Sequence, residues 1–315
     1  MVYACFSPHL RYFLNIYLAE SYVPRLPKPG ETIHGSRFSI GFGGKGANQC
    51  VSSGRLGART AMVAKIGTDS FGDDYLKNLQ DSGVNTDFVY RTSEASTGVA
   101  PISVTDEGQN AIVIVPGANL LLTESDVIAA ETLIQSAKVL VCQLEISPPI
   151  TVMAMRLARK HGVRTILNPA PALSDLPEEM FTLSDILCPN ETEAEILSGM
   201  SVKSVDDAKK ASLLLLDRGC KAVIITLGEQ GAVVAFQGET TPIHIPAKKV
   251  KSIDSTGAGD AFLGGLAFYL STLPGLEFIE AVRRAGEIAT ISVQAEGTQK
   301  SYPYRANLEP HMFAV

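Results

Sequence analysis

The sequence predicts an α/β protein: a three-layer sandwich with a mostly parallel central sheet and a small β-sheet lid. From about residue 44 onward, short apolar runs alternate with amphipathic stretches, which is the pattern of strands buried between helices. Two regions, residues 32–42 and 97–115, interrupt this alternation with extended segments that have no helix between them. The 315 residues are 45% hydrophobic, which is enough for a large core, and we expect a single domain over residues 1–315.

The main-sheet elements follow in a regular order. Residues 44–57 predict a helix and residues 61–66 a strand. Thr123 with Asp126 three positions later predicts a capping box that opens a helix over residues 123–137. Residues 138–144 are a continuous apolar run, as in a strand buried on both faces. Further strands are expected at residues 164–167, 185–188 and 222–227, and further helices at residues 150–161, 191–197, 205–216, 258–271 and 277–294.

Residues 97–115 predict a hairpin of the lid. Two extended runs, residues 100–104 and 111–115, flank a turn at residues 107–109. A small sheet over the mouth of an α/β domain can exclude water from a reaction. The alternative is an extra edge hairpin with no motion.

Charge and cysteine content exclude several classes of function. The net charge of −6, without a basic block, argues against a nucleic-acid surface. Five scattered cysteines without a CxxC pair favour reduced thiols over a disulfide framework or a zinc site. No apolar run reaches the length of a membrane span, and the N-terminal stretch lacks the features of a signal peptide. We therefore expect a cytoplasmic protein with no membrane or nucleic-acid partner.

The segment Asp254-Ser-Thr-Gly-Ala-Gly-Asp260 carries the clearest chemical signal. It opens an apolar helix, and its small residues let a ligand approach the backbone. The first N–H groups of a helix lack partners and lie at the positive end of the helix dipole, which suits a transferring phosphoryl group. Asp260 follows the turn and is placed to accept a proton from an attacking hydroxyl. The alternative is a glycine-rich turn in which Asp260 only caps the helix.

A second glycine-rich segment, Gly41-Phe-Gly-Gly-Lys-Gly-Ala-Asn-Gln49, leads into the first predicted helix. Its polar side chains stand where the backbone is least crowded, which suits a sugar with many hydroxyls. The segment is not a P-loop, because Gly46 follows Lys45 where Ser or Thr is needed. It also lacks the βαβ context of a dinucleotide fingerprint. A nucleotide is therefore expected to bind elsewhere.

Together these two segments resemble the ribokinase-like carbohydrate kinase family, which also includes adenosine kinases and fructokinases. The resemblance extends from about Arg25 to Tyr304, and residues 26–32, 43–49 and 168–172 look like its ribokinase branch. It implies ATP-dependent phosphorylation of D-ribose to ribose 5-phosphate, with Mg²⁺ and K⁺, and a homodimer through the lid. A kinase for deoxyribose or another sugar is an alternative. A catalytically weak homologue that binds sugar or nucleotide is another.

The resemblance also implies a role for each matching residue. The expected catalytic base is Asp260, beside an anion hole made by the backbone of Gly257, Ala258 and Gly259. The expected sugar contacts are Gly43, Gly44, Lys45, Asn48 and Glu145. The expected nucleotide contacts are Asn190, Thr226, Gly228 and Gly231. Glu193 is expected to order Mg²⁺ through water. The expected ligands of K⁺ are Asp254, Thr256, Ser292, Ala295, Gly297 and Ser301.

Several of these residues have a structural alternative. Glu145 can be an ion-pair partner at a strand end, Asn190 a helix cap, and residues 226–231 a strand-to-strand turn. Gly286 departs from the family, because a position near the adenine is often polar in relatives.

The N-terminal segment, residues 1–23, does not resemble the family. Relatives carry an Asp that holds two sugar hydroxyls eight residues before a Leu-Pro or Phe-Pro pair, and counting back from Leu26 places Leu18 there. A leucine cannot replace two charge-assisted hydrogen bonds, and each unpaired hydroxyl costs about 1–3 kcal/mol. We expect an atypical N-terminus, as from an alternative exon or start site, and impaired sugar affinity. A shifted register would bring Asn15 or Glu20 into this place instead.

Overall fold

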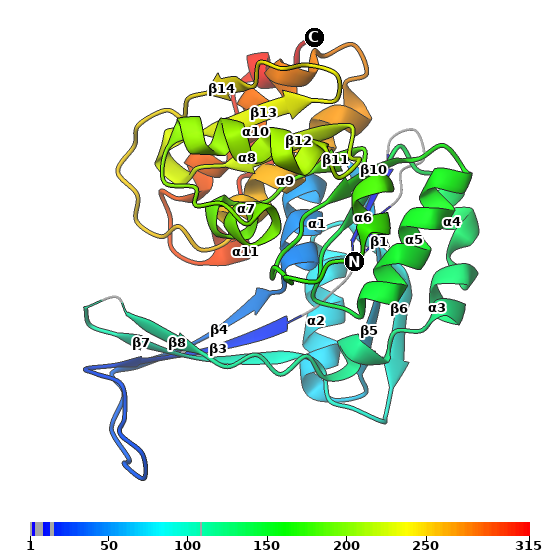
Figure 1. Cartoon of the computed structure of the whole chain (residues 1–315). Coiled ribbons are helices and arrows are strands. Elements are labelled where there is room, and N and C mark those ends of the chain that lie inside the picture. The colour runs from blue at the N-terminus through cyan, green and yellow to red at the C-terminus, as the bar shows by residue number, and fades with distance from the viewer. Residues whose placement is uncertain (1, 4–8, 13–15, 108) are drawn as a thin grey trace.

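The computed structural model describes residues 2–3, 9–12, 16–107 and 109–315, with side chains from residue 16 onward. A ten-stranded sheet lies between two layers of helices, and a separate four-stranded sheet projects from this body (Figure 1). The predicted fold class is confirmed. Among the described residues, no helix is both long and apolar enough to span a membrane.

The large sheet is built on parallel strands. From one edge to the other, its order is β14-β13-β12-β11-β10-β9-β2-β1-β5-β6, with a further pairing between β2 and β5. Strands β1 and β13 run antiparallel to the others, and β14 pairs antiparallel with β13. The strand bounds are β1 (Val2–Tyr3), β2 (His9–Tyr12), β5 (Arg59–Gly67), β6 (Val84–Thr92), β9 (Val139–Cys142), β10 (Arg164–Leu167), β11 (Ile186–Leu187), β12 (Ala222–Thr226), β13 (Ala232–Phe236) and β14 (Ile243–Ile245).

The direction of chain progression reverses beside β2. Strands β5 and β6 lie on one side of β2, and β9 to β12 follow on the other. At such a point the loops after the strands diverge and leave a crevice at the carboxyl ends. The segments after β9, β10 and β11 begin with Gln143, Asn168 and Cys188, so these residues face that end of the sheet.

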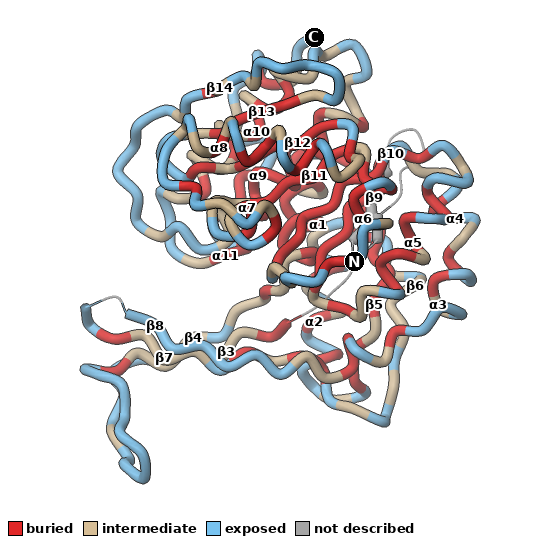
Figure 2. Tube along the Cα trace, viewed as in Figure 1, coloured by how far each residue is buried: buried red, intermediate tan, exposed pale blue. Residues whose placement is uncertain are grey.

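Helices form the two outer layers. In one layer α1 (Lys45–Arg55), α9 (Ala258–Thr272) and α10 (Phe278–Ser292) pack against one another, and α5 (Pro148–Lys160) and α8 (Val205–Leu216) lie in the other. Buried residues concentrate between the layers (Figure 2). The shorter helices are α2 (Ser70–Asp81), α3 (Glu124–Ala129), α4 (Glu131–Gln135), α6 (Glu178–Thr182), α7 (Glu191–Ser198) and α11 (Thr298–Ser301).

The helix predicted over residues 123–137 is two short helices, α3 and α4. The predicted capping box is present: the Thr123 side chain accepts from the Asp126 N–H, and Asp126 accepts from the Thr123 N–H. The break falls at Ala130, whose φ of −89° and ψ of 7° leave the helical region.

The four-stranded sheet has the order β4-β3-β7-β8. Its strands are β3 (Ile16–Val23), β4 (Arg37–Gly43), β7 (Val99–Thr105) and β8 (Asn110–Ile112). Three of them overlap the segments expected in a small sheet, and β7 and β8 form the expected antiparallel hairpin. Strand β3 was not predicted. It lies in the middle, antiparallel to β4 and parallel to β7, and so joins the two expected parts.

Aromatic packing fixes the base of the four-stranded sheet to the body. Tyr17 stacks on Phe71 of α2 with ring centroids 4.6 Å apart, and Phe42 meets Tyr75 edge-on at 5.2 Å. The Tyr75 hydroxyl donates to the Gly43 carbonyl. The Gly43–Gly44 backbone is therefore held where the sheet joins α1.

We predict that a methyl group at Gly264 destabilises the protein, because α1 and α9 cross closely there. A Cβ at Gly264 would lie 2.5 Å from the Ser52 Cβ and 2.7 Å from the Gln49 carbonyl oxygen. Gly264→Ala is expected to lower the free energy of unfolding by about 1–3 kcal/mol in denaturant titrations. The matched control is Gly286→Ala on α10, where no atom lies within 4 Å of the added Cβ. That change should stabilise by up to about 1 kcal/mol. Equal effects of the two changes would contradict the close crossing.

Candidate active site

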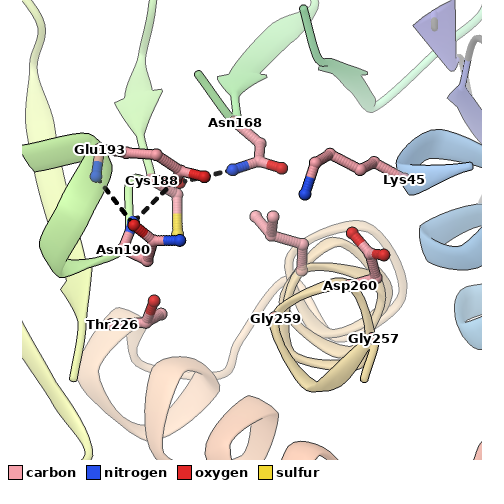
Figure 3. A pocket seen from close by; sticks show the side chains of 10 residues that line it. Lys45, Asn168, Cys188, Asn190, Glu193, Thr226, Gly257, Gly259 and Asp260 are labelled. Atoms are coloured by element: carbon pink, nitrogen blue, oxygen red, sulfur yellow. Dashed lines mark hydrogen bonds between the residues drawn. The ribbon is translucent and has the colours of Figure 1, made fainter. Parts of the chain in front are cut away.

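A cavity of about 160 Å³ opens where β10, β11 and β12 end opposite the N-terminus of α9 (Figure 3). Seven predicted site residues line it: Lys45, Asn190, Glu193, Thr226, Gly257, Gly259 and Asp260. Three lining residues were not predicted: Asn168, Cys188 and Leu263. Asn168 and Cys188 directly follow two parallel strands, so the rule that ligands bind at the carboxyl ends of such strands would have found both. The cavity is smaller than a typical ligand pocket, so a whole nucleotide must extend beyond it.

Asp260 lies in the first turn of α9 and is 7% exposed. Its Oδ1 accepts from the Gln49 amide at 2.9 Å, and its Oδ2 accepts from the Asn48 amide at 2.9 Å. Burial raises the pKa of Asp260, and it outweighs the opposing effects of Lys45 and of the two amide donors. The carboxylate is thus a fixed proton acceptor whose affinity for protons is increased by burial.

The turn that precedes Asp260 is held in a conformation that favours glycine. Gly257 has a φ of +77°, and a Cβ there would lie 2.5 Å from the Tyr302 hydroxyl and would collide with the Thr298 methyl. The N–H groups of the first turn of α9 have no acceptors inside the helix. The Ala258 N–H donates to the Ser255 carbonyl at 3.2 Å, so this predicted donor is partly used within the turn. Gly259 faces the cavity directly.

Lys45 and Glu145 meet beside Asp260. The Lys45 backbone N–H donates to a Glu145 carboxylate oxygen at 2.8 Å. Burial raises the pKa of Glu145 to about 7, although the positive charge of Lys45 opposes this. Burial lowers the pKa of Lys45, but attraction to Asp260, Glu145 and Glu193 outweighs it and raises the pKa overall. Lys45 therefore supplies a permanent positive charge at the cavity, toward which its side chain extends (Figure 3).

Asn190 and Glu193 form a capping box at the start of α7. The Asn190 Oδ1 accepts from the Glu193 N–H at 2.8 Å, and the Glu193 Oε2 accepts from the Asn190 N–H at 2.9 Å. The structural alternative for Asn190 is therefore present, and both residues nevertheless line the cavity. Burial raises the pKa of Glu193.

The structure places only one of the three residues expected to line the nucleotide after β12 at the cavity: Thr226, but not Gly228 or Gly231. Thr226 ends β12 and lines the cavity, and its N–H donates to the Pro189 carbonyl at 3.0 Å. Gly228 and Gly231 lie in the turn between the antiparallel strands β12 and β13 and do not line the cavity. Residues 226–231 thus form the strand-to-strand turn that was the structural alternative for this segment.

The residues expected around a monovalent cation come from two segments that lie side by side. The Ile253 and Asp254 N–H groups donate to the Val293 carbonyl at 2.7 and 3.2 Å. Asp254 accepts from the Thr256 N–H and the Gly297 N–H, both at 2.9 Å. Burial raises the pKa of Asp254, but these backbone donors outweigh it and hold the pKa below its usual value. None of the expected cation ligands lines the cavity: Asp254, Thr256, Ser292, Ala295, Gly297 and Ser301.

Acidic, cysteine and histidine side chains do not form a metal centre in the described part of the chain. No three of them gather closely enough to hold an ion. Hard cations also bind to single carboxylates combined with backbone carbonyls, hydroxyls, water or substrate phosphates.

Leu18 lies where an acidic sugar ligand was expected from the family. It is opposite Gly41 on β4, and a Cβ at Gly43 would lie 2.8 Å from the Leu18 Cγ. Glu20 is opposite Ser39, farther from Gly43, and its carboxylate accepts from the Tyr22 hydroxyl at 3.4 Å. Asn15 lies outside the described residues. Among the described side chains of β3, an apolar one faces the Gly43 backbone.

The fold and the site define a phosphotransferase of the sugar-kinase class: a buried carboxylate, a permanent cation and a glycine-rich helix N-terminus converge where parallel strands end. The family model described as "pfkB family carbohydrate kinase" matches residues 14–305. The chain belongs to the pfkB family of carbohydrate kinases.

The relatives are similar over most of their length. The chain is 54% identical to the mouse (Mus musculus) protein named ribokinase over 293 residues, which cover 93% of this chain and 91% of the mouse protein. It is 39% identical to a deoxyribokinase of Salmonella typhimurium, over 90% of this chain and 91% of that protein. The structure of Arabidopsis thaliana ribokinase with ribose and ATP superposes with a TM-score of 0.86 at 31% identity, over 94% of this chain and 95% of that one.

The family match begins at residue 14, before the position near Arg25 where the resemblance was expected to start. Strand β3 therefore belongs to the matched region, and the expectation that all of residues 1–23 are unlike the family is wrong for residues 14–23.

We predict that Glu145 makes stability depend on pH. Between its ordinary pKa of 4.5 and its folded pKa of about 7, the folded protein keeps a proton that the unfolded chain has released. The free energy of unfolding should therefore fall as pH rises through this window, by up to about 3 kcal/mol. Glu145→Gln should remove this contribution. Thermal unfolding of both proteins at pH 5, 6, 7 and 8 checks it, and parallel pH profiles would show that Glu145 does not titrate there.

Proposed function

We propose that this chain transfers the γ-phosphoryl group of ATP to D-ribose and forms ribose 5-phosphate. The observation that carries the proposal is the meeting of Asp260, Lys45 and the first turn of α9 in one cavity. The mouse and Arabidopsis relatives, which are named ribokinases, support ribose as the substrate.

The proposed reaction uses the two sides of the cavity. A sugar hydroxyl attacks the γ-phosphorus and gives its proton to Asp260, while the bond between that phosphorus and the ADP oxygen breaks. The N–H groups of the Gly257–Gly259 turn and the Lys45 ammonium stabilise the charge that develops on the transferred group. Sugar contacts come from Gly43, Gly44, Lys45, Asn48 and Glu145, and nucleotide contacts from Asn190, Thr226, Gly228 and Gly231.

Two cations belong to the proposal. The donors around Asp254 and Gly297 are carboxylate, hydroxyl and carbonyl oxygens, and the depressed pKa of Asp254 keeps it negative, which suits a hard monovalent ion such as K⁺. Glu193 has a carboxylate at the cavity wall and suits Mg²⁺ held through water. When bound, these ions would neutralise negative charge on the phosphates and beside the anion hole.

We also propose that the four-stranded sheet is a lid and that two chains pair through it. The exposed apolar side chains on this sheet and just after β8 support an interface: Phe38, Ile40, Ile112, Val113 and Ile114. A cytoplasmic location belongs to the same proposal, because the scattered cysteines of the sequence favour a reducing compartment.

A second candidate function is the phosphorylation of a deoxypentose. The observation that favours it is the apolar Leu18 side chain against the Gly43 backbone, which offers no partner to a sugar hydroxyl. A sugar that lacks one hydroxyl would lose less on binding there. The similarity to the Salmonella deoxyribokinase supports this candidate to a lesser degree.

We predict that Asp260→Asn abolishes turnover and leaves binding intact, because it removes the proton acceptor and keeps the shape of the side chain. A coupled assay of ADP release with ribose and Mg-ATP, with and without K⁺, should show a rate reduced by about 10²–10⁴-fold. Calorimetric titration should show ribose and ATP binding close to that of the unchanged protein.

Two outcomes would contradict this prediction. Loss of folding in Asp260→Asn would assign Asp260 a structural role. Absence of ribose-dependent turnover in the unchanged protein, with nucleotide binding retained, would exclude the ribose kinase function. Turnover with 2-deoxyribose in its place would favour the second candidate.

We predict that Leu18→Asp lowers the Michaelis constant for ribose, because a carboxylate at Gly43 can accept from sugar hydroxyls. Restoring one charged hydrogen bond should lower it by about tenfold or more. The matched control is Leu18→Met, which keeps an apolar side chain of similar volume. Steady-state kinetics with varied ribose measure the effect, and equal constants for the Asp and Met variants would place Leu18 outside the sugar site.

A further inference from the structure

Gln49 of α1 is fully buried, and both ends of its amide are engaged. Its Nε2 donates to the Asp260 Oδ1 at 2.9 Å and to the Asn168 Oδ1 at 3.2 Å. Its Oε1 accepts from the Gln143 Nε2 at 2.6 Å. Gln49 does not line the cavity, so it touches the site only through Asp260 and Asn168.

The direction of these hydrogen bonds is fixed by the charge at one end. An ionised carboxylate only accepts hydrogen bonds, so Gln49 must present its nitrogen to Asp260 and its oxygen to Gln143. Gln143 then donates to Gln49, and its own Oε1 is buried without a hydrogen-bond partner among the described residues. Leaving such an atom unpaired costs stability. The unpaired Gln143 Oε1 therefore accompanies an arrangement in which the Gln49 amide N–H donates to Asp260.

Gln49 and Asn48 together fix the plane of the Asp260 carboxylate. Each donates to a different oxygen, and Asn48 is fixed in turn because its Oδ1 accepts from the Gln299 amide at 3.1 Å. A carboxylate held at both oxygens cannot rotate about its Cβ–Cγ bond without losing a hydrogen bond. Gln49 differs from Asn48 in that it has no expected contact with the sugar.

The charged and titratable groups around Asp260 come from several elements. Lys45 of α1 is the cation, Glu145 after β9 and Glu193 of α7 are the acidic neighbours, and Tyr75 of α2 is the phenol. Gln49 is neutral, so replacing it by an apolar side chain changes the hydrogen bonding of Asp260 without changing the charge of the site.

We propose that Gln49, oriented by Gln143, is a positioning residue that holds the Asp260 carboxylate in the orientation needed to accept the proton of the attacking hydroxyl. The inference rests on the proposed role of Asp260 as the base. Catalysis by such a base depends on its geometry, and a displacement of about 1 Å can cost about 100-fold in rate.

The central test replaces Gln49 by methionine, which keeps the length of the side chain and removes the donor. Carbon-13 NMR of protein labelled at the aspartate carboxyl carbons follows the titration of Asp260, with Asp260→Asn assigning its signal. Because the lost hydrogen bond stabilises the ionised form, the midpoint should rise by about one pH unit. In the same variant kcat should fall by about 10- to 100-fold, the acid limb of its pH profile should move up, and KM for ATP should stay within about twofold.

Two further variants separate positioning from folding. Ser52→Ala is the matched control, because its hydroxyl joins α1 to the Ala261 carbonyl of α9 at 3.3 Å and does not touch Asp260. It should leave the titration and the pH profile unchanged. Gln143→Met keeps Gln49 but removes the hydrogen bond that orients its amide. It should therefore move the Asp260 titration midpoint and the pH profile of kcat in the same direction as Gln49→Met does, by a smaller amount. If Gln49→Met does not fold, the Gln143→Met variant alone tests the proposal.

An Asp260 midpoint that is unchanged in both glutamine variants, with kcat falling only as the folded fraction falls, would overturn the proposal. Equal shifts in Ser52→Ala would overturn it as well, because they would show a general response to loosening α1. The NMR titration needs no turnover. If the unchanged protein phosphorylates no pentose, the proposed function fails, and the titration still decides whether Gln49 holds Asp260.

Discussion

The Asp260 carboxylate keeps its place because α1 and α9 cross closely at Gly264, where α9 has no side chain and the small Ser52 of α1 fills the contact. A buried charge is costly unless hydrogen-bond donors reach it. The crossing brings Asn48 and Gln49 of α1 within 2.9 Å of the two carboxylate oxygens at the start of α9. A wider separation of the helices would leave the carboxylate buried and without hydrogen-bond donors. The chemistry of the site therefore depends on the close packing of α1 against α9.

The same helices connect the site to both of its neighbours. On the lid side, Tyr75 donates to the Gly43 carbonyl, immediately before α1. On the side of the expected cation loop, the Tyr302 hydroxyl donates to the Gly257 carbonyl at 3.0 Å, and Gln299 donates to Asn48. The proposed cation, by ordering residues 292–301, would therefore act on the Gly257 turn and on Asn48, a donor to Asp260. This gives a physical route for activation by an ion that does not touch the substrate.

The local sequence pattern was enough to predict strands and helices of the main sheet and its helical layers. Arg164–Leu167 and Val205–Leu216 have the predicted bounds, because a short buried run and an amphipathic period are both set by neighbouring residues. The two glycine-rich segments identified four of the residues that line the cavity: Lys45, Gly257, Gly259 and Asp260. Strand β3 and the Gln143–Gln49 pair could not be found in this way. Gln143 and Gln49 lie 94 positions apart in the sequence. A glutamine at the start of a loop gives no local pattern that would indicate a contact so far along the chain.

The two halves of the site carry unequal consequences for catalysis. In the proposed mechanism, the phosphoryl-transfer half combines Asp260, Lys45 and the α9 turn, and these groups would act on charge that develops in the transition state. The proposed place of Leu18 is beside sugar hydroxyls that do not react, so any binding lost there would be lost equally from the ground state and the transition state. A loss of that kind raises KM and leaves kcat unchanged. On the proposed function, a chain with Leu18 in this position would therefore still catalyse the transfer, at sugar concentrations high enough to compensate for the missing hydrogen bonds.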